Sequence, residues 1–248
     1  MDLRGGVKVR LEILRRVNAQ SEPYLQVIEY TPKSKNDTVA FALSEINKGG
    51  YRDESGAEVS RIMWEHSCLQ KKCGACAMVI NGTPGLACGA RLSEINKNGV
   101  IRIEPLRKFP VTADLMVDRQ VMLDNLLKLE AWLQTQVKIN ERQAELAYDA
   151  SRCLQCGCCL EVCPNFYAGG EFYGMAAGVP AARLIAELAP ADGKALKRGY
   201  DKHIFEGCGK SLSCKSICPA GIETDRMLAR SNAAAVWKRI FGRCQKQR

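Results

Sequence analysis

The sequence predicts an α+β protein in which a strand-rich N-terminal domain precedes an all-α C-terminal domain. Its 248 residues fit one large domain or two small ones, since domains usually span roughly 100–200 residues. Apolar and charged residues alternate over Val7–Ile13, as in a half-buried strand, whereas apolar residues recur with a helical period over Asp114–Leu133. We therefore expect domains at residues 1–108 and 109–248, with the boundary near Phe109-Pro110.

The N-terminal domain is expected to contain a sheet and one helix. Apolar and alternating segments predict four strands, at residues 7–13, 24–30, 77–80 and 100–103. Asp37 or Thr38 can cap a helix that runs to Ile46 and stops at Gly49-Gly50. In the C-terminal domain, periodicity predicts three helices, at residues 114–133, 181–188 and 224–240, and the glycine-rich segment 169–178 predicts a loop.

The thirteen cysteines indicate a reduced, cytoplasmic protein. The first eight residues lack an apolar leader, and polar residues follow the twin arginine Arg15-Arg16, so an export signal is not predicted. No segment approaches the roughly 18 apolar residues of a transmembrane helix. Cytoplasmic thiols stay reduced, and clusters of them usually bind metal or serve redox chemistry.

The net charge of +9 raises the possibility of nucleic-acid binding, which the site chemistry argues against. The formal count leaves out whatever the cysteines bind: three metal centres with thiolate ligands would each add about −2 and leave roughly +3. No basic stripe interleaved with aromatic residues is present, so no nucleic-acid partner is expected. The chain also lacks a GxGxxG motif, a P-loop and a nucleophile with a paired base, so no catalytic residues are expected.

The first cysteine group predicts a [2Fe-2S] cluster. Its ligands would be Cys68, Cys73, Cys76 and Cys88, in the C-x4-C-x2-C…C order of plant-type ferredoxins. Gly74 permits a sharp turn that leaves backbone N–H groups free to point at the sulfurs. The alternative is a four-cysteine zinc site, although structural zinc more often uses two short pairs.

The second and third groups predict a [4Fe-4S] and a [3Fe-4S] cluster. The second group has the bacterial ferredoxin spacing C-x2-C-x2-C-x3-C-P, in which the fourth cysteine binds the other cluster. By this crossover the [4Fe-4S] ligands are Cys153, Cys156, Cys159 and Cys218, and the [3Fe-4S] ligands are Cys163, Cys208 and Cys214. Ser211 takes the place of the missing fourth cysteine, and we expect it to stay unligated. Two cysteines remain: Cys158, expected to be a packed free thiol, and Cys244, expected to be inert.

With these motifs the chain resembles the iron–sulfur subunit of succinate:quinone oxidoreductases, the family of succinate dehydrogenases and fumarate reductases. The resemblance covers nearly the whole chain, including Trp64 before Cys68, the junction motif from Pro105 to Asp118, and the two Cys-Pro runs with Ser211. It implies an N-terminal β-grasp domain of the plant-type ferredoxin kind, followed by an all-α domain like bacterial ferredoxins.

The resemblance also implies partners and a route for electrons. A flavoprotein subunit with FAD would oxidise succinate, and electrons would pass through the two-iron, four-iron and three-iron clusters to quinone in a membrane-anchor subunit. The chain would then be a peripheral protein on the cytoplasmic face of the cell membrane. Where the ubiquinone-linked branch has a Trp and a His near the quinone, this sequence has Ala168 and Gly209. At these positions the sequence resembles the menaquinone-linked branch, whose anchor is a cytochrome b with haem.

Two other readings stay open on the sequence alone. The chain could be a free multi-cluster ferredoxin carrier or the cluster subunit of another flavin-linked complex. The basic residues near the C-terminus, such as Arg230 and Lys238, could dock on the anchor or lie on a solvated helix end. The direction, succinate oxidation or fumarate reduction, is left undetermined.

Overall fold

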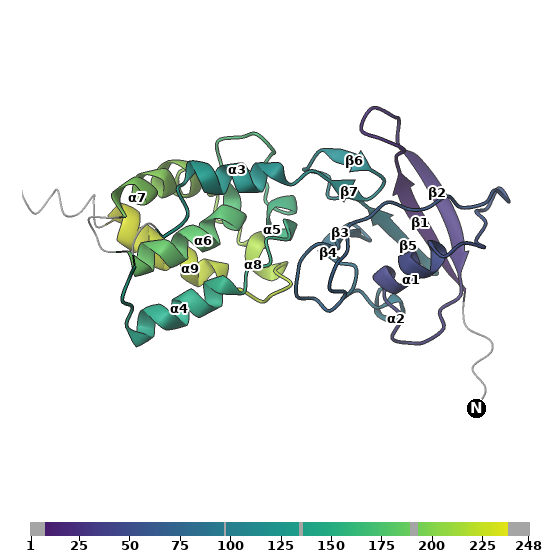
Figure 1. Ribbon diagram of the computed structural model, residues 1–248, viewed down its shortest axis with the longest axis horizontal. Coiled ribbons are helices and arrows are strands. Elements are labelled where there is room, and N and C mark those ends of the chain that lie inside the picture. The colour runs from purple at the N-terminus through teal and green to yellow at the C-terminus, as the bar shows by residue number, and fades with distance from the viewer. Residues whose placement is uncertain (1–7, 97, 134–135, 189–192, 238–248) are drawn as a thin grey trace, which may run out of the picture. The chain divides into compact units, whose positions relative to one another are not determined.

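The chain forms two compact units, residues 1–118 and 119–248. They are coloured purple to teal and teal to yellow in Figure 1. The sequence predicted a boundary at 108–109, and the short strands β6 (Val111–Ala113) and β7 (Met116–Val117) lie between the two positions. The computed structural model describes residues 8–96, 98–133, 136–188 and 193–237. Cys244 and the basic tail from Lys238 onward lie outside these residues.

The first unit is built on a five-stranded mixed sheet in the order β2-β1-β5-β3-β4 (Figure 1). Its strands are β1 (Val9–Arg15), β2 (Tyr24–Tyr30), β3 (Ala77–Ile80), β4 (Thr83–Leu86) and β5 (Val100–Glu104). β1 pairs antiparallel with β2 and parallel with β5. The predicted alternation is present in β1, where Leu11 and Ile13 are fully buried and Arg10 is exposed. All four predicted strands are thereby confirmed, with ends that differ by at most two residues.

Strand β4 was not predicted, because its sequence Thr-Pro-Gly-Leu contains two residues that disfavour strands. It lies at the edge of the sheet, where the N–H that Pro84 lacks is not needed by a neighbouring strand. The predicted helix is α1 (Val39–Ile46), and the hydroxyl of Thr38 caps it by accepting a hydrogen bond from the Phe41 N–H at 3.2 Å. A short helix, α2 (Leu92–Ile95), follows later in the same unit.

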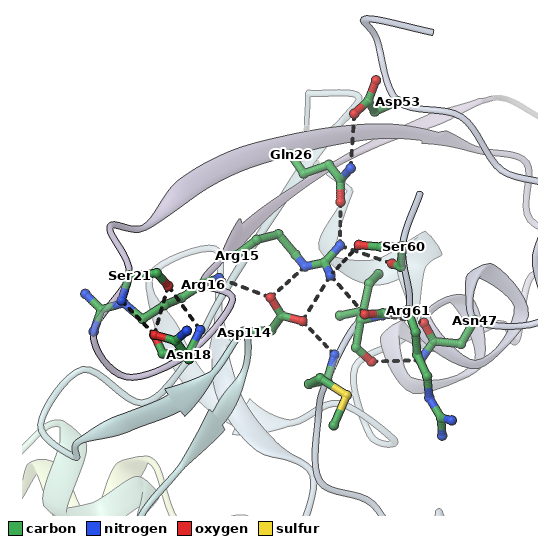
Figure 2. Close-up of polar contacts among 12 residues, drawn as sticks. Arg15, Arg16, Asn18, Ser21, Gln26, Asn47, Asp53, Ser60, Arg61 and Asp114 are labelled. Carbon is green, nitrogen blue, oxygen red and sulfur yellow. Dashed lines mark hydrogen bonds and ion pairs between the residues drawn. The ribbon is translucent and has the colours of Figure 1, made fainter. Parts of the chain in front are cut away.

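A buried ion pair joins distant parts of the first unit (Figure 2). Arg15 and Asp114 are both at least 96% buried, and Arg15 Nε donates to Asp114 Oδ1 at 2.8 Å. Arg15 Nη1 also donates to Gln26 Oε1 on β2, at 2.5 Å. The Met63 N–H donates to Asp114 Oδ2 at 2.7 Å. The network therefore fixes the segment that leads, five residues later, to Cys68.

The described part of the second unit contains helices and no strand. Its α-helices are α3 (Gln120–Lys128), α4 (Glu141–Ser151), α5 (Cys158–Glu161), α6 (Gly174–Glu187), α7 (Lys194–Tyr200), α8 (Ser213–Ser216) and α9 (Thr224–Asn232). Two π-helices, η1 (Asp201–Phe205) and η2 (Ala233–Trp237), extend α7 and α9. Helix α6 is buried along most of its length and packs against α3, α4, α5, α7 and α9 (Figure 1).

One helix prediction and one loop prediction are wrong in part. The helix expected at 114–133 is confirmed only for α3, because Asp114 turns the chain between β6 and β7 with a φ of +44°. Glu130 ends the helix with a φ of +52°. The loop expected at 169–178 is wrong from Gly174 onward, because its small residues form the first turns of α6 and are buried there. Tertiary packing outweighs the low helix propensity of glycine in this segment.

The other helix predictions are confirmed within the described residues. The helix expected at 181–188 is the C-terminal half of α6, and the one expected at 224–240 is α9 followed by η2 as far as Trp237. In the described part of the chain, every helix is too short or too polar to cross a membrane.

Candidate metal centres

The register of the β3–β4 hairpin brings two of the predicted [2Fe-2S] ligands together. Ala77 pairs with Leu86, so Cys76, just before β3, and Cys88, just after β4, meet at the same end of the hairpin. Their sulfur atoms lie 3.3 Å apart, too far for a disulfide bond of about 2.05 Å. None of the described cysteines forms a disulfide. The first turn of α1 also holds this end, since the Ala40 N–H donates to the Ala87 carbonyl at 3.1 Å.

The loop from Cys68 to Cys76 directs backbone N–H groups at the sulfur atoms. Gln70 and Lys72 donate to Cys68 Sγ at 3.3 and 3.4 Å, and Lys71 donates to Cys88 Sγ at 3.3 Å. Left-handed backbone at Leu69 and Lys71, with φ of +53° and +60°, turns these groups inward. The sequence placed the sharp turn at Gly74, which does have a φ of +77°. The donors, however, belong to residues between the first and second cysteines.

The surroundings of these thiols suit thiolates in a metal centre. Backbone N–H groups of Gln70 and Lys72 lower the pKa of Cys68 to about 7. Burial raises the pKa of Cys76 to about 12, so a free thiol there stays protonated at neutral pH. A metal ion offsets that cost by deprotonating a coordinating thiol. Cys73, the fourth predicted ligand, is exposed.

In the second unit, the predicted [4Fe-4S] ligands line one cavity. Cys153, Cys156, Cys159 and Cys218 border a space of about 420 Å³ that is otherwise largely apolar, with Met175 and Val179 of α6 on its wall. Burial raises the pKa of Cys153 and that of Cys159. A cavity of this kind disfavours bare thiolates, so these cysteines would be deprotonated together only with cationic iron coordinated to their sulfurs.

The predicted [3Fe-4S] ligands line a second cavity, of about 390 Å³. Cys163, Cys208 and Cys214 border it together with Ser211, the residue that replaces a fourth cysteine. Cys159 and Cys214 border both cavities, so the two spaces are neighbours. The Asn165 side chain braces the second cavity by donating from Nδ2 to the Gly207 carbonyl at 2.6 Å.

Two side chains that the sequence did not single out lie within hydrogen-bond distance of ligand sulfurs. Gln155 Nε2 lies 3.3 Å from Cys153 Sγ, and Thr224 Oγ1 lies 3.3 Å from Cys214 Sγ. No sequence signal identifies Thr224, because it reaches Cys214 across ten residues through the packing of α9. Gln155 lies inside a metal-binding motif, but its role depends on where its side chain points.

Cys158 is completely buried and borders neither cavity. Its thiol hydrogen-bonds to Cys156, which raises the pKa of Cys158 and lowers that of Cys156 to about 7. The two histidines also have local partners: His66 packs edge-on against Trp64 and His203 stacks on Tyr173. Among the described residues, no three His, Cys, Asp or Glu side chains converge as they would around a single ion.

Two family descriptions match the chain. A "2Fe-2S iron-sulfur cluster binding domain" matches residues 10–124, and a "4Fe-4S dicluster domain" matches residues 149–222. Each match contains the cysteines that the motifs assigned to that kind of cluster. The chain therefore combines both types of iron–sulfur domain.

Similar proteins extend the match to nearly the whole chain. The succinate dehydrogenase iron–sulfur subunit of Bacillus subtilis is 34% identical over 90% of this chain and 91% of its own length. The fumarate reductase iron–sulfur subunit of Wolinella succinogenes is 27% identical over 86% of this chain and 90% of its own. A chain of the Mycobacterium smegmatis Sdh1 complex in the apo form has the same fold, with a TM-score of 0.73 over 92% of this chain and 97% of that one, at 20% identity. The protein belongs to the family of iron–sulfur subunits of succinate dehydrogenase and fumarate reductase.

Proposed function

We propose that this chain conducts electrons between an FAD-bearing flavoprotein subunit and quinone in a membrane-anchor subunit. The proposed route runs through [2Fe-2S], [4Fe-4S] and [3Fe-4S] clusters, in the direction of succinate oxidation or of fumarate reduction. The observation that carries it is the pair of neighbouring cavities that share Cys159 and Cys214. Two adjacent cysteine-lined cavities can hold two clusters side by side, as electron transfer requires. An iron–sulfur cluster supplies a one-electron couple, and the protein sets its potential through charge, hydrogen bonds to sulfur and solvent exposure.

The proposed [2Fe-2S] ligands are Cys68, Cys73, Cys76 and Cys88. The 3.3 Å approach of Cys76 Sγ to Cys88 Sγ supports a shared site for these two. The three backbone donors to Cys68 and Cys88 favour thiolates over thiols. For the surrounding unit we propose the β-grasp fold of plant-type ferredoxins, which the five-stranded mixed sheet and helix α1 support.

The crossover assignment is proposed for the second unit. Cys153, Cys156, Cys159 and Cys218 would hold the [4Fe-4S] cluster, and the cavity that they line together supports this set. Cys163, Cys208 and Cys214 would hold the [3Fe-4S] cluster in the neighbouring cavity. Ser211 borders that second cavity, which supports its place at the vacant corner of a cubane.

We further propose menaquinone and a cytochrome b anchor with haem as the membrane partners. A Cβ added at Gly209 would lie 3.2 Å from Asn165 Nδ2, so a histidine at this position would crowd the brace of the second cavity. The second cavity thus differs from the quinone site of the ubiquinone-linked branch, in which a histidine at the position of Gly209 approaches the quinone. A peripheral place on the cytoplasmic face of the membrane follows from such partners.

The test is reduction of the clusters by substrate in the assembled complex. The chain would be co-expressed with the flavoprotein and anchor genes of the same organism, and the purified complex would be mixed anaerobically with succinate. We expect EPR signals of reduced clusters after succinate and their loss after a quinone or excess fumarate. Clusters that respond to dithionite but never to succinate would refute this function and favour a free ferredoxin carrier.

A further inference from the structure

Gln155 has a fixed position between the four-iron cavity and helix α6. Its Nε2 lies 2.9 Å from the Ala176 carbonyl oxygen and 3.3 Å from Cys153 Sγ. The carbonyl can only accept a hydrogen bond, so the amide nitrogen, and not the amide oxygen, must face it. The second hydrogen of the same NH2 group is then available to the sulfur of Cys153.

Helix α6 leaves the Ala176 carbonyl available for this contact. Pro180 lies inside the helix, and as a proline it has no N–H to donate to the carbonyl four residues earlier, which is that of Ala176. Gln155 supplies a donor in its place. The proline and the glutamine therefore act together, and the anchoring holds the donor at Cys153 instead of leaving it to rotate in solvent.

Thr224 contacts a proposed ligand of the other cluster, Cys214, which borders both cavities, whereas Thr224 itself borders only the four-iron cavity. It is 2% exposed, and its hydroxyl oxygen lies 3.3 Å from Cys214 Sγ. A thiolate that binds iron has no proton to give, so in the loaded protein the hydroxyl must be the donor. The burial of Thr224 removes water as a competing partner and gives the bond its full electrostatic effect.

We propose that Gln155 and Thr224 set the reduction potentials of the [4Fe-4S] and [3Fe-4S] clusters separately, each through one hydrogen bond to one ligand sulfur. The inference rests on the ligand sets proposed above. Reduction adds negative charge to a cluster and its thiolates, and a fixed donor stabilises the reduced form more than the oxidised form. Loss of a donor should therefore make the cluster bound by its sulfur partner harder to reduce, and should shift the potential of the other cluster by less.

The experiment is an EPR-monitored redox titration of the full-length protein in its complex. Gln155→Leu and Gln155→Met remove the amide, and the second keeps its length. Thr224→Val removes the hydroxyl at nearly constant shape, and Thr224→Ser retains it as the matched control. We expect about a tenfold lower ratio of reduced to oxidised cluster at a fixed potential, a shift of about 59 mV for a one-electron couple.

The pattern of shifts decides the inference. It predicts a lower four-iron potential in both Gln155 variants, a lower three-iron potential in Thr224→Val, and wild-type potentials in Thr224→Ser. Unchanged potentials, equal shifts of both clusters, or loss of the four-iron cluster from both Gln155 variants would overturn it, the last because Gln155 would then serve assembly. A different result would refute the proposed ligand sets: a wild-type spectrum that does not show one two-iron, one four-iron and one three-iron cluster. A wild-type protein without a four-iron signal would overturn the role of Gln155 as well.

Discussion

Asp114 is expected to be the most sensitive polar residue of the first unit. Its carboxylate accepts four N–H groups: Arg15 Nε at 2.8 Å and the Arg16 N–H at 3.0 Å on Oδ1, and Arg15 Nη2 at 3.0 Å and the Met63 N–H at 2.7 Å on Oδ2. The substitution Asp114→Asn keeps the shape but turns one oxygen into an NH2 group, so two of the four donors lose their acceptor. It also leaves the buried Arg15 guanidinium without its counter-charge.

The expected cost is about 3 kcal/mol, the lower end of the range for breaking a buried ion pair by removing one partner. For a unit of this size such a loss lowers the melting temperature by about 10 °C. The assay is thermal unfolding of the cluster-loaded protein followed by the visible absorbance of the clusters, with both proteins scanned at one rate because cluster loss is irreversible.

Glu29→Gln provides the matched control. It breaks the ion pair between Glu29 and Lys8, whose N–O distance of 2.7 Å is similar to that of the Arg15–Asp114 pair. The side chains of Glu29 and Lys8 are, however, 60% and 67% exposed. Exposed pairs contribute about 0–1 kcal/mol, so little change is expected. If Asp114→Asn melted as the Glu29→Gln protein does, the buried network would not be what fixes the segment before Cys68.

Three further predictions concern the second unit. Ser211→Cys should convert the three-iron EPR signal of the oxidised protein into a four-iron signal on reduction, and an unchanged cluster type would show that Ser211 is not at the vacant corner. Cys158→Ala should retain all three cluster signals, since this thiol borders neither cavity, whereas loss of the four-iron signal would make it a ligand. Gly174→Ala should destabilise the protein by at least about 1 kcal/mol in denaturant unfolding, because Gly174 has a φ of +64° and its new Cβ would lie 2.4 Å from Leu160 Cδ2. Gly170→Ala is the control, since the atoms nearest to its new Cβ belong to the ring of Tyr167, a residue that is 66% exposed and has room to move aside. Equal losses in the two variants would contradict this account.

Cysteine spacing predicted which thiols lie close together, because each group is local in sequence. Three thiols within nine residues can reach one cluster whatever the rest of the fold does. The crossover of Cys163 and Cys218 stays a prediction from the bacterial ferredoxin spacing. Hydrogen bonds from side chains to sulfur were not predictable in the same way. Gln155 depends on a carbonyl of α6 that is available only because Pro180 lies four residues further along the helix. Thr224 depends on the position of α9 relative to Cys214.

Local patterns predicted four of the five strands of the large sheet but failed where tertiary contacts decide the backbone. Apolar residues after Asp114 recur with a helical period. The Asp114 carboxylate, however, accepts hydrogen bonds from Arg15 and from the Met63 N–H, and these contacts hold the chain in a hairpin instead of a helix. The glycine-rich start of α6 suggests a loop, but small residues allow other helices to pack closely around it. The N-terminus of α4 could have been found, since Asn140 and Gln143 form a capping box that is visible in the sequence.

The central claim, that eleven cysteines hold three clusters of different kinds, is tested most directly by low-temperature EPR of the purified protein or its complex. The sample would be measured after air oxidation and again after reduction with dithionite. The account predicts a three-iron signal in the oxidised sample, and two-iron and four-iron signals after reduction. Two four-iron signals without a three-iron signal, in intact protein, would contradict the assignment of Ser211 and the crossover of the cysteines.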